Sequence, residues 1–295
     1  MRRQIVRALA LVAVFICGNL AAQISVIDST GARLTMVAPA KRIIALSPHL
    51  TELVYAAGAG AQLVGVSEYS DFPPEAAKLP TVSNFAGINV ERVAALKPDL
   101  VLVWQSGTRP EWIVQLRKLG IPVFADEPKS FDDIAATIGA LGALAGTQAT
   151  ANAAALAVRT RVAGLRKSYA ATSPVRVFYQ ISETPLLTIN RQHFLSQALS
   201  LCGAVNVFGD LAPYVPQVSR EAVLAANPDA IVGGTDATRS EKNIAFWRSI
   251  KSLRAVQDSS VFAVDGYKLH RQTPRALDEA AYLCEAIDRV RSKPR

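Results

Sequence analysis

The sequence predicts an α/β protein with two lobes, each built on a mainly parallel sheet, joined by one long helix. Three observations predict this fold. Strands and helices alternate along the chain, a helix–turn–strand unit occurs twice, and an alanine-rich stretch separates the two halves. Alternating strands and helices are typical of βαβ units, in which the connected strands run parallel. Two related halves around one helical stretch therefore predict two lobes.

The first half begins with a β-hairpin and continues with βαβ units. Apolar residues alternate over Ile24–Val37 around a turn-rich centre, which predicts the hairpin. The apolar run Arg42–Leu46 is typical of a strand covered on both faces. A helix then begins at Ser47 and Pro48 and ends at Gly58. Further predicted elements are strand 63–66, helix 90–96, strand 100–104, helix 111–119, strand 121–124 and, opening the second half, strand 175–179.

The internal repeat relates Asn89–Val103 (NVERVAALKPDLVLV) to Ser219–Gly233 (SREAVLAANPDAIVG). Each copy contains a glutamate at the helix start, a Pro-Asp turn and an apolar strand. Coincidence between two ordinary helix–turn–strand units is the alternative, because proline after a helix is common. The shared glutamate at the same place favours two equivalent lobes.

The alanine-rich stretch Phe131–Tyr169 is nearly free of strand-forming residues. Gly146 and Thr147 interrupt it, so we expect two helices, the second beginning near Thr147. A single helix between the lobes would limit hinge motion. The predicted division is a signal peptide over 1–22, an N-terminal lobe over 23–146, a bridging helix over 147–172 and a C-terminal lobe over 173–295.

The N-terminus has the pattern of an export signal. Arginines at positions 2, 3 and 7 precede the apolar run Ala8–Cys17, and small residues at 21 and 22 permit cleavage before Gln23. The run is too short to cross a bilayer of ~30 Å as a helix, although an uncleaved anchor is the alternative. Subtracting these three arginines from the net charge of +8 leaves +5 without a basic stripe, which argues against nucleic-acid binding. The pattern predicts an exported protein whose signal peptide is cleaved.

Two cysteines, Cys202 and Cys284, remain after removal of the signal. An even pair in an oxidising compartment favours one disulfide, and two buried free thiols are the alternative. Motifs for catalysis are missing from the sequence. Its three histidines form no HExxH pair, and there is no Gly-x-Ser-x-Gly elbow, Walker loop or Gly-x-Gly-x-x-Gly. We therefore expect a binding protein without a cofactor, not an enzyme.

Four aromatic residues lie in loops at the predicted strand ends, where α/β sheets bind ligands. Trp104 ends one strand, Tyr69 follows another, and Phe85 and Tyr214 lie in loops that precede the two repeat helices. Flat rings in such loops suit a large planar or macrocyclic ligand. Alternatively, each ring closes the end of its own core.

The two repeat glutamates, Glu91 and Glu221, also allow two interpretations. A carboxylate in the first turn of a helix is stabilised by the helix dipole and needs no partner. Their equivalent places in the two lobes instead suggest a symmetric pair of docking points for basic residues on a dimeric membrane protein.

Four segments carry a specific resemblance: Arg42–Glu52 (RIIALSPHLTE), Val64–Pro74 (VGVSEYSDFPP), Val82–Pro98 and Pro216–Glu221 (PQVSRE). Together they resemble the periplasmic vitamin B12-binding proteins of ABC importers. The resemblance extends over essentially all of the chain after the signal, within a superfamily that includes siderophore- and haem-binding proteins. It implies two lobes bridged by one helix, with a corrinoid bound in the cleft between them and delivered to a permease.

The resemblance also implies roles for single residues. It implies that Tyr69, Trp104 and Arg271 contact the ligand, with Asp265 or Tyr267 nearby; that Glu91 and Glu221 dock on permease arginines; and that Cys202 pairs with Cys284. Such carriers usually work as monomers.

Some positions depart from the family pattern. Phe85 and Val215 stand where its best-known members have tryptophan, although Tyr214 beside Val215 could substitute, and Glu183–Asn190 lacks an expected phenylalanine. His49 and His270 are predicted in loops facing the cleft, either as solvated surface groups or as neighbours of a ligand's cobalt or iron. A ferric-siderophore or haem binder of the same fold is therefore the alternative function.

Overall fold

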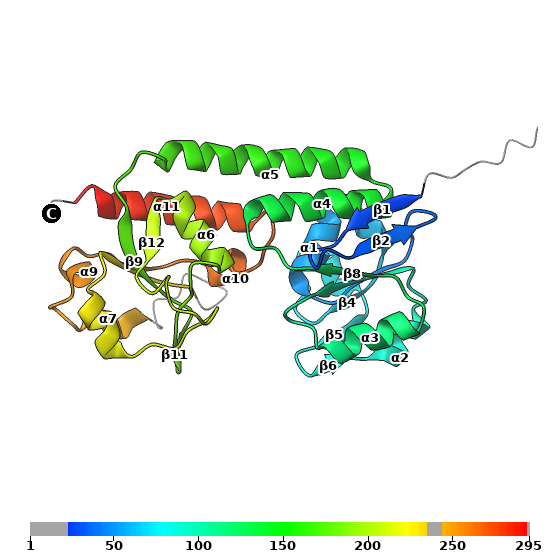
Figure 1. Ribbon diagram of the computed structural model, residues 1–295, viewed down its shortest axis with the longest axis horizontal. Coiled ribbons are helices and arrows are strands. Elements are labelled where there is room, and N and C mark those ends of the chain that lie inside the picture. The colour runs from blue at the N-terminus through cyan, green and yellow to red at the C-terminus, as the bar shows by residue number, and fades with distance from the viewer. Residues whose placement is uncertain (1–22, 235–243, 294–295) are drawn as a thin grey trace, which may run out of the picture.

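The computed structural model describes residues 23–234 and 244–293, so the predicted signal peptide over 1–22 lies outside the described residues. Two α/β lobes lie side by side, and the long helix α5 (Gln148–Tyr169) runs along both of them (Figure 1). The predicted fold class is confirmed. The position of α5 agrees with a bridging helix over 147–172, while the exact lobe boundaries stay a prediction.

The N-terminal lobe contains a six-stranded sheet in the order β6-β5-β4-β3-β7-β8 and a separate hairpin β1–β2. All neighbours in the sheet pair in parallel except β5 and β6, which are antiparallel. The strands are β1 (Ile24–Ile27), β2 (Arg33–Met36), β3 (Ile43–Ala45), β4 (Leu63–Ser67), β5 (Thr81–Asn84), β6 (Gly87–Ile88), β7 (Leu100–Trp104) and β8 (Val123–Asp126). The helices are α1 (Pro48–Ala56), α2 (Val90–Ala95), α3 (Pro110–Lys118) and α4 (Phe131–Ala145), with short 3-10 turns η1 (Gly60–Gln62) and η2 (Ala76–Lys78).

The C-terminal lobe contains a four-stranded parallel sheet in the order β12-β9-β13-β14. Its strands are β9 (Val175–Gln180), β12 (Ala204–Asn206), β13 (Ala230–Gly233) and β14 (Val261–Ala263), with a small hairpin of β10 (Ser182–Glu183) and β11 (Leu186–Leu187). Its helices are α6 (Phe194–Leu201), α7 (Arg220–Ala226), α8 (Ala245–Arg248), α9 (Arg254–Gln257), α10 (Gly266–Leu269) and α11 (Ala276–Arg291).

Most elements predicted in the first half are confirmed, with one shifted strand. The strand predicted over 121–124 is β8, which begins at Val123. The backbone N–H of Ile121 still bonds to Leu116 of the preceding helix, and Pro122 has no N–H to donate to the ladder. Glycines predicted to end helices do so in the left-handed region, at Gly58 (φ 77°) and Gly146 (φ 72°).

Helix α5 packs on helices of both lobes, on α4 in the N-terminal lobe and on α11 in the C-terminal lobe (Figure 1). Close approach to α4 requires a glycine, because a Cβ on Gly142 would lie 2.2 Å from that of Ala151. Under α5 the cores of the two lobes are continuous, since Phe131 of α4 and Phe194 of α6 have ring centroids 4.8 Å apart. A shared core beneath the bridging helix limits how far the lobes can move apart.

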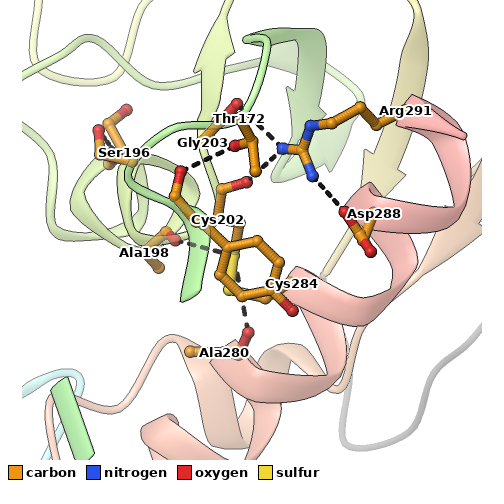
Figure 2. The surroundings of a disulfide bond; sticks show 11 residues. Thr172, Ser196, Ala198, Cys202, Gly203, Ala280, Cys284, Asp288 and Arg291 are labelled. Atoms are coloured by element: carbon orange, nitrogen blue, oxygen red, sulfur yellow. Dashed lines mark hydrogen bonds and ion pairs between the residues drawn. A yellow bond between two sulfur atoms is a disulfide. The ribbon is translucent and has the colours of Figure 1, made fainter. Parts of the chain in front are cut away.

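The Cys202–Cys284 disulfide joins the end of α6 to α11, which confirms the predicted pair over the alternative of free thiols (Figure 2). Arg291, the last residue of the same helix, donates to the carbonyl oxygen of Cys202 at 2.8 Å and to Asp288 at 2.5 Å. The covalent link and the arginine together attach α11 to the layer of the C-terminal lobe that faces α5.

The two copies of the internal repeat also share hydrogen bonds that their aspartates accept. Asp99 accepts hydrogen bonds from the backbone N–H groups of Lys41 (2.7 Å) and Arg42 (2.9 Å), and Asp229 accepts one from Arg176 (2.9 Å). Each aspartate lies between a repeat helix and the strand that follows it. Its hydrogen bonds attach the start of that strand to the start of the neighbouring strand.

Arginines at the start of those neighbouring strands close the ends of the repeat helices: Arg42 directly precedes β3, and Arg176 is the second residue of β9. The guanidinium of Arg42 donates to the carbonyl of Leu96 at 2.7 Å, and that of Arg176 to the carbonyl of Ala226 at 2.8 Å. The last carbonyls of a helix lack partners inside it. Matching contacts in both lobes confirm two structurally related halves.

Candidate functional site

A pocket of about 250 Å³ opens at the edge of the N-terminal sheet where strands β3, β4 and β7 have their carboxyl ends. It brings together three residues predicted to contact a ligand: Tyr69, Phe85 and Trp104. Its walls are formed by Leu46, Ser47, Pro48, Ser67, Glu68, Tyr69, Ser83, Asn84, Phe85, Ala86, Gly87, Ile88, Trp104, Gly107, Thr108, Arg109 and Trp112. The lining belongs to the N-terminal lobe alone.

Trp104 is positioned from two sides. Its indole lies against the backbone of Gly107, where a Cβ would approach its Cε3 atom to 2.0 Å. The ring of His49 meets it edge-on with centroids 5.7 Å apart. The aromatic face in this wall therefore depends on a glycine that the sequence does not mark, three residues beyond the strand.

Tyr69 is 65% exposed and has a backbone φ of 63°, in the left-handed region that a bulky residue rarely adopts. Hydroxyl groups hold the turn around it, because Ser70 bonds to Thr51 at 3.0 Å and to Ser67 at 3.1 Å. Such a backbone conformation persists only where neighbouring contacts enforce it. The turn thus presents the Tyr69 ring at the pocket.

Phe85 and Trp112 complete the aromatic lining. Phe85 is 94% exposed in the tight connection between β5 and β6. Trp112, near the start of α3, was not predicted as a site residue. Its ring lies against Gly87, where a Cβ would come within 2.9 Å of Cζ2. Its place just after the loop that follows Trp104 is the only sequence signal that could have identified it.

Four polar atoms in this wall have no hydrogen-bond partner in the part of the chain that the structure describes. They are Oε2 of Glu68, Oγ of Ser83 and Nε1 of both Trp104 and Trp112. Buried polar atoms are ordinarily paired. The wall therefore combines aromatic faces with unpaired donors and acceptors, which suits a ligand with an apolar ring and polar substituents.

On the C-terminal lobe, Tyr214 and Val215 are 41% and 37% exposed. The Tyr214 ring packs on that of His193 with centroids 4.5 Å apart, and burial lowers the pKa of His193 to about 4. His193 is therefore neutral near pH 7. Neither Tyr214 nor Val215 lines the N-terminal pocket.

Asp265 is a helix-capping residue. Its carboxylate accepts a hydrogen bond from the backbone N–H of Lys268 at the start of α10, and Lys268 is also its ion-pair partner at 3.4 Å. Asp265 is only 7% exposed. These contacts account for its burial without a ligand, and its predicted ligand contact stays a prediction.

Arg271 and Tyr267 reach across to the N-terminal lobe. Arg271 donates to Oε1 of Glu52 at 2.9 Å, to Asp71 at 2.8 Å and to the carbonyl of Tyr69 at 3.0 Å, and the Tyr267 hydroxyl donates to Asp71. Partial burial acts to raise the pKa of Asp71, but hydrogen bonds from Tyr267 and Arg271 outweigh it and lower that pKa. These residues join the lobes beside the Tyr69 turn.

The expectation of solvated loop histidines is wrong. His49 is the second residue of α1, is 4% exposed, and lies 3.0 Å from Oγ of Ser47 and 3.5 Å from Asp126. His270 ends α10 and lies 3.1 Å from the Tyr179 hydroxyl, and its burial lowers its pKa to about 4. Loop sequence alone does not show that both rings pack into their lobes. Within residues 23–234 and 244–293, no group of three potential metal ligands is present.

Glu91 and Glu221 are exposed in the first turns of α2 and α7. Ser219 caps α7, and Asn89 caps α2. Hydrogen bonds from its own backbone N–H and from Ser219 lower the pKa of Glu221. Both helices begin at equivalent places in the two lobes. Within the described residues, no helix is both long and apolar enough to span a membrane.

Comparison with known proteins shows which proteins this chain is similar to. Residues 43–267 match the family model described as periplasmic binding protein. A vitamin B12-binding protein of Vibrio cholerae serotype O1 is 42% identical over 247 residues, which cover 83% of this chain and 88% of the relative. One from Yersinia pestis is 41% identical over 248 residues, covering 84% and 86%. The matched relatives are binding proteins, not enzymes.

Solved structures of periplasmic binding proteins are also similar to this chain. The crystal structure of a periplasmic vitamin B12 binding protein of Vibrio cholerae superposes with a TM-score of 0.80 at 41% identity, covering 86% of this chain and 99% of that one. A periplasmic haem-binding protein in complex with two haems has a TM-score of 0.74 at 21% identity, covering 85% and 99%, which shows the shared fold. The resemblance drawn from the sequence is confirmed.

Proposed function

The chain belongs to the periplasmic binding protein family, and we propose that it binds cobalamin or a related corrinoid and delivers it to the permease of an ABC importer. The pocket formed by Tyr69, Phe85, Trp104 and Trp112 carries the proposal. Aromatic faces bind a large ring by burial, and polar atoms in the same wall suit the polar groups at its edge. The relatives named as vitamin B12-binding proteins, at about 40% identity, support this ligand class.

The size of the pocket suggests how such a ligand would lie. About 250 Å³ is below the usual range for a pocket that encloses a whole ligand, roughly 300–1,000 Å³. Only part of a corrinoid fits there, so its remainder would lie between the lobes against Tyr214, Val215 and Arg271. In this arrangement Tyr214 takes the role of a tryptophan, and Phe85 supplies a smaller ring.

The remaining roles follow from the same proposal. The protein is exported to the periplasm with cleavage before Gln23, acts as a monomer, and catalyses no reaction. Glu91 and Glu221, exposed in the first turns of equivalent helices, dock on basic residues of a dimeric permease. Bound corrinoid is cargo, so no cofactor is required.

Titration of the purified protein with cyanocobalamin, cobinamide, haem and a ferric siderophore tests the proposal. Sub-micromolar binding of a corrinoid with quenching of tryptophan fluorescence is expected, because a corrin ring would lie close to Trp104 and Trp112. Replacing Trp104 with Phe is expected to remove much of the quenching while keeping binding. Tight binding of haem or a ferric chelate, with no binding of either corrinoid, would contradict it.

A further inference from the structure

A buried ionic cluster centred on Glu52 joins the two lobes. The Glu52 side chain on α1 is 3% exposed, and both of its oxygens bind arginines of the opposite lobe. Its Oε1 accepts from Arg271 Nη1 at 2.9 Å and from Arg275 Nη2 at 2.5 Å, and its Oε2 accepts from Arg275 Nε at 2.9 Å. Burying a carboxylate is costly unless it is paired and hydrogen-bonded. The hydrogen bonds that compensate for the burial of Glu52 therefore come from the C-terminal lobe.

A second acid completes the cluster. Asp71 binds the same Nη1 atom of Arg271 at 2.8 Å and accepts a hydrogen bond from Tyr267. Both carboxylates come from the N-terminal lobe and both guanidinium groups from the C-terminal lobe, so two negative charges meet two positive ones. Such complementarity favours one register of the lobes, because any other would leave buried charges unpaired.

Aromatic rings fix the orientation of both arginines. The guanidinium of Arg275 lies 3.8 Å from the ring centroid of Phe72, and that of Arg271 lies 3.8 Å from the centroid of Tyr267. A planar guanidinium that stacks on a ring while it donates to carboxylates has little freedom to turn. The side chains of Arg271 and Arg275 are accordingly only 11% and 22% exposed.

The cluster reaches the pocket through Tyr69. Nη2 of Arg271 donates to the Tyr69 carbonyl at 3.0 Å, at the residue whose φ is 63°. An unusual backbone conformation depends on the contacts around it. Because Arg271 is held by Glu52, the position of the Tyr69 ring in the pocket wall depends on a carboxylate that lies outside the pocket lining.

We propose that Glu52 is a positioning residue for ligand binding, which holds Arg271 on the Tyr69 turn and sets the separation of the lobes at that contact. Glu52 does not touch the ligand. It preorganises both walls between which the ligand lies, so its main effect is on the dissociation rate of the ligand complex. This inference rests on the proposed function in that the ligand lies between the lobes and contacts Tyr69.

The test compares Glu52→Gln, which keeps the side-chain shape and removes the charge, with the unsubstituted protein. We expect the dissociation rate of cyanocobalamin to rise about tenfold and the association rate to change less than about threefold. Spin labels on cysteines introduced at Glu111 and Lys251, both exposed and in different lobes, are expected to show a broader distance distribution in the ligand-free variant. Asp278→Asn is the matched control, because Asp278 is an exposed acid that pairs with Arg161 at 2.6 Å and not with Arg271 or Arg275. It is expected to change neither measurement.

A lower thermal midpoint for Glu52→Gln, with an unchanged dissociation rate and distance distribution, would overturn the inference and leave Glu52 a structural residue. Should that variant not fold, Asp71→Asn replaces it, because Asp71 is 48% exposed and the substitution removes a negative charge that pairs with Arg271. A rise of about threefold in the dissociation rate is then expected, and no rise overturns the inference. If the unsubstituted protein binds no corrinoid, the proposed function fails, while the distance measurement still decides whether Glu52 holds the lobes.

Discussion

The indole of Trp104 lies directly on the backbone of Gly107, so close that a Cβ on Gly107 would be 2.0 Å from Cε3 of Trp104. A methyl group cannot be accommodated at this separation, and the ring would have to leave its place in the pocket wall. Since the ring closes one side of the proposed site, Gly107 controls the shape of that site through the position of the Trp104 ring.

Gly107→Ala is therefore expected to weaken corrinoid binding about tenfold, because a displaced aromatic anchor loses most of its contact with the ligand. Isothermal titration and the extent of tryptophan quenching measure the change. Gly164→Ala in α5 is the control, because nothing lies within 4 Å of the added Cβ. Alanine there favours the helix by up to about 1 kcal/mol and is expected to leave binding unchanged. Unaltered affinity in Gly107→Ala would show that the Trp104 ring does not contribute to the site.

Glu91→Ala combined with Glu221→Ala is expected to reduce uptake by the importer at least about tenfold. The reason is that basic residues of the permease would lose an acidic partner on each lobe. Ligand affinity is expected to stay within about twofold, since both residues lie outside the pocket lining. Glu111→Ala is the matched control, because Glu111 is also exposed in a helix first turn. Loss of ligand affinity in the double variant would place the glutamates in the binding site instead.

Replacement of Cys202 and Cys284 by serine is expected to lower the free energy of unfolding by about 4 kcal/mol. The bond closes a loop with a sequence separation of 82, and opening it restores conformational freedom to the unfolded chain. Urea unfolding measures the loss, and dithiothreitol should destabilise the unsubstituted protein by a similar amount without affecting the variant. A reductant without effect on the unsubstituted protein would contradict a stabilising disulfide.

Stability is expected to fall as the pH drops from about 6.5 toward 4, and His270 contributes to this fall. Burial lowers its pKa from 6.5 to about 4, so the unfolded chain takes up the proton first. The stabilising contribution is complete above pH 6.5 and is lost as the pH approaches 4.

His270→Gln tests this pH dependence, because glutamine can still bond to the Tyr179 hydroxyl but does not titrate. Between pH 7.5 and pH 5 the variant is expected to lose about 1–2 kcal/mol less unfolding free energy than the unsubstituted protein. His193, with a similarly lowered pKa, is present in both proteins, and its charge also acts to lower the pKa of His270. Parallel pH profiles for the two proteins would show that His270 is not buried as a neutral group.

Local sequence signals predicted much of the N-terminal lobe and the bridging helix. Apolar runs marked the strands, Gly58 and Gly146 marked helix ends, and the repeat marked two related halves. These signals act over a few residues, through backbone conformation and hydrogen bonds that neighbours provide. The short strands β5 and β6 were missed, because two to four residues carry too little periodicity to be recognised.

The candidate site, like the fold, was predicted only in part from local sequence signals. Tyr69, Phe85 and Trp104 were predictable because the carboxyl ends of parallel strands meet at one edge, and the structure places all three in one pocket. The sequence by itself thus determined the lobes, the repeat and the aromatic wall. Only the tertiary structure decided that Trp112 joins the pocket, that His49 is buried, and that Glu52 binds an arginine 219 residues away. The physical reason is that such contacts depend on how helices and lobes pack, which no local pattern encodes.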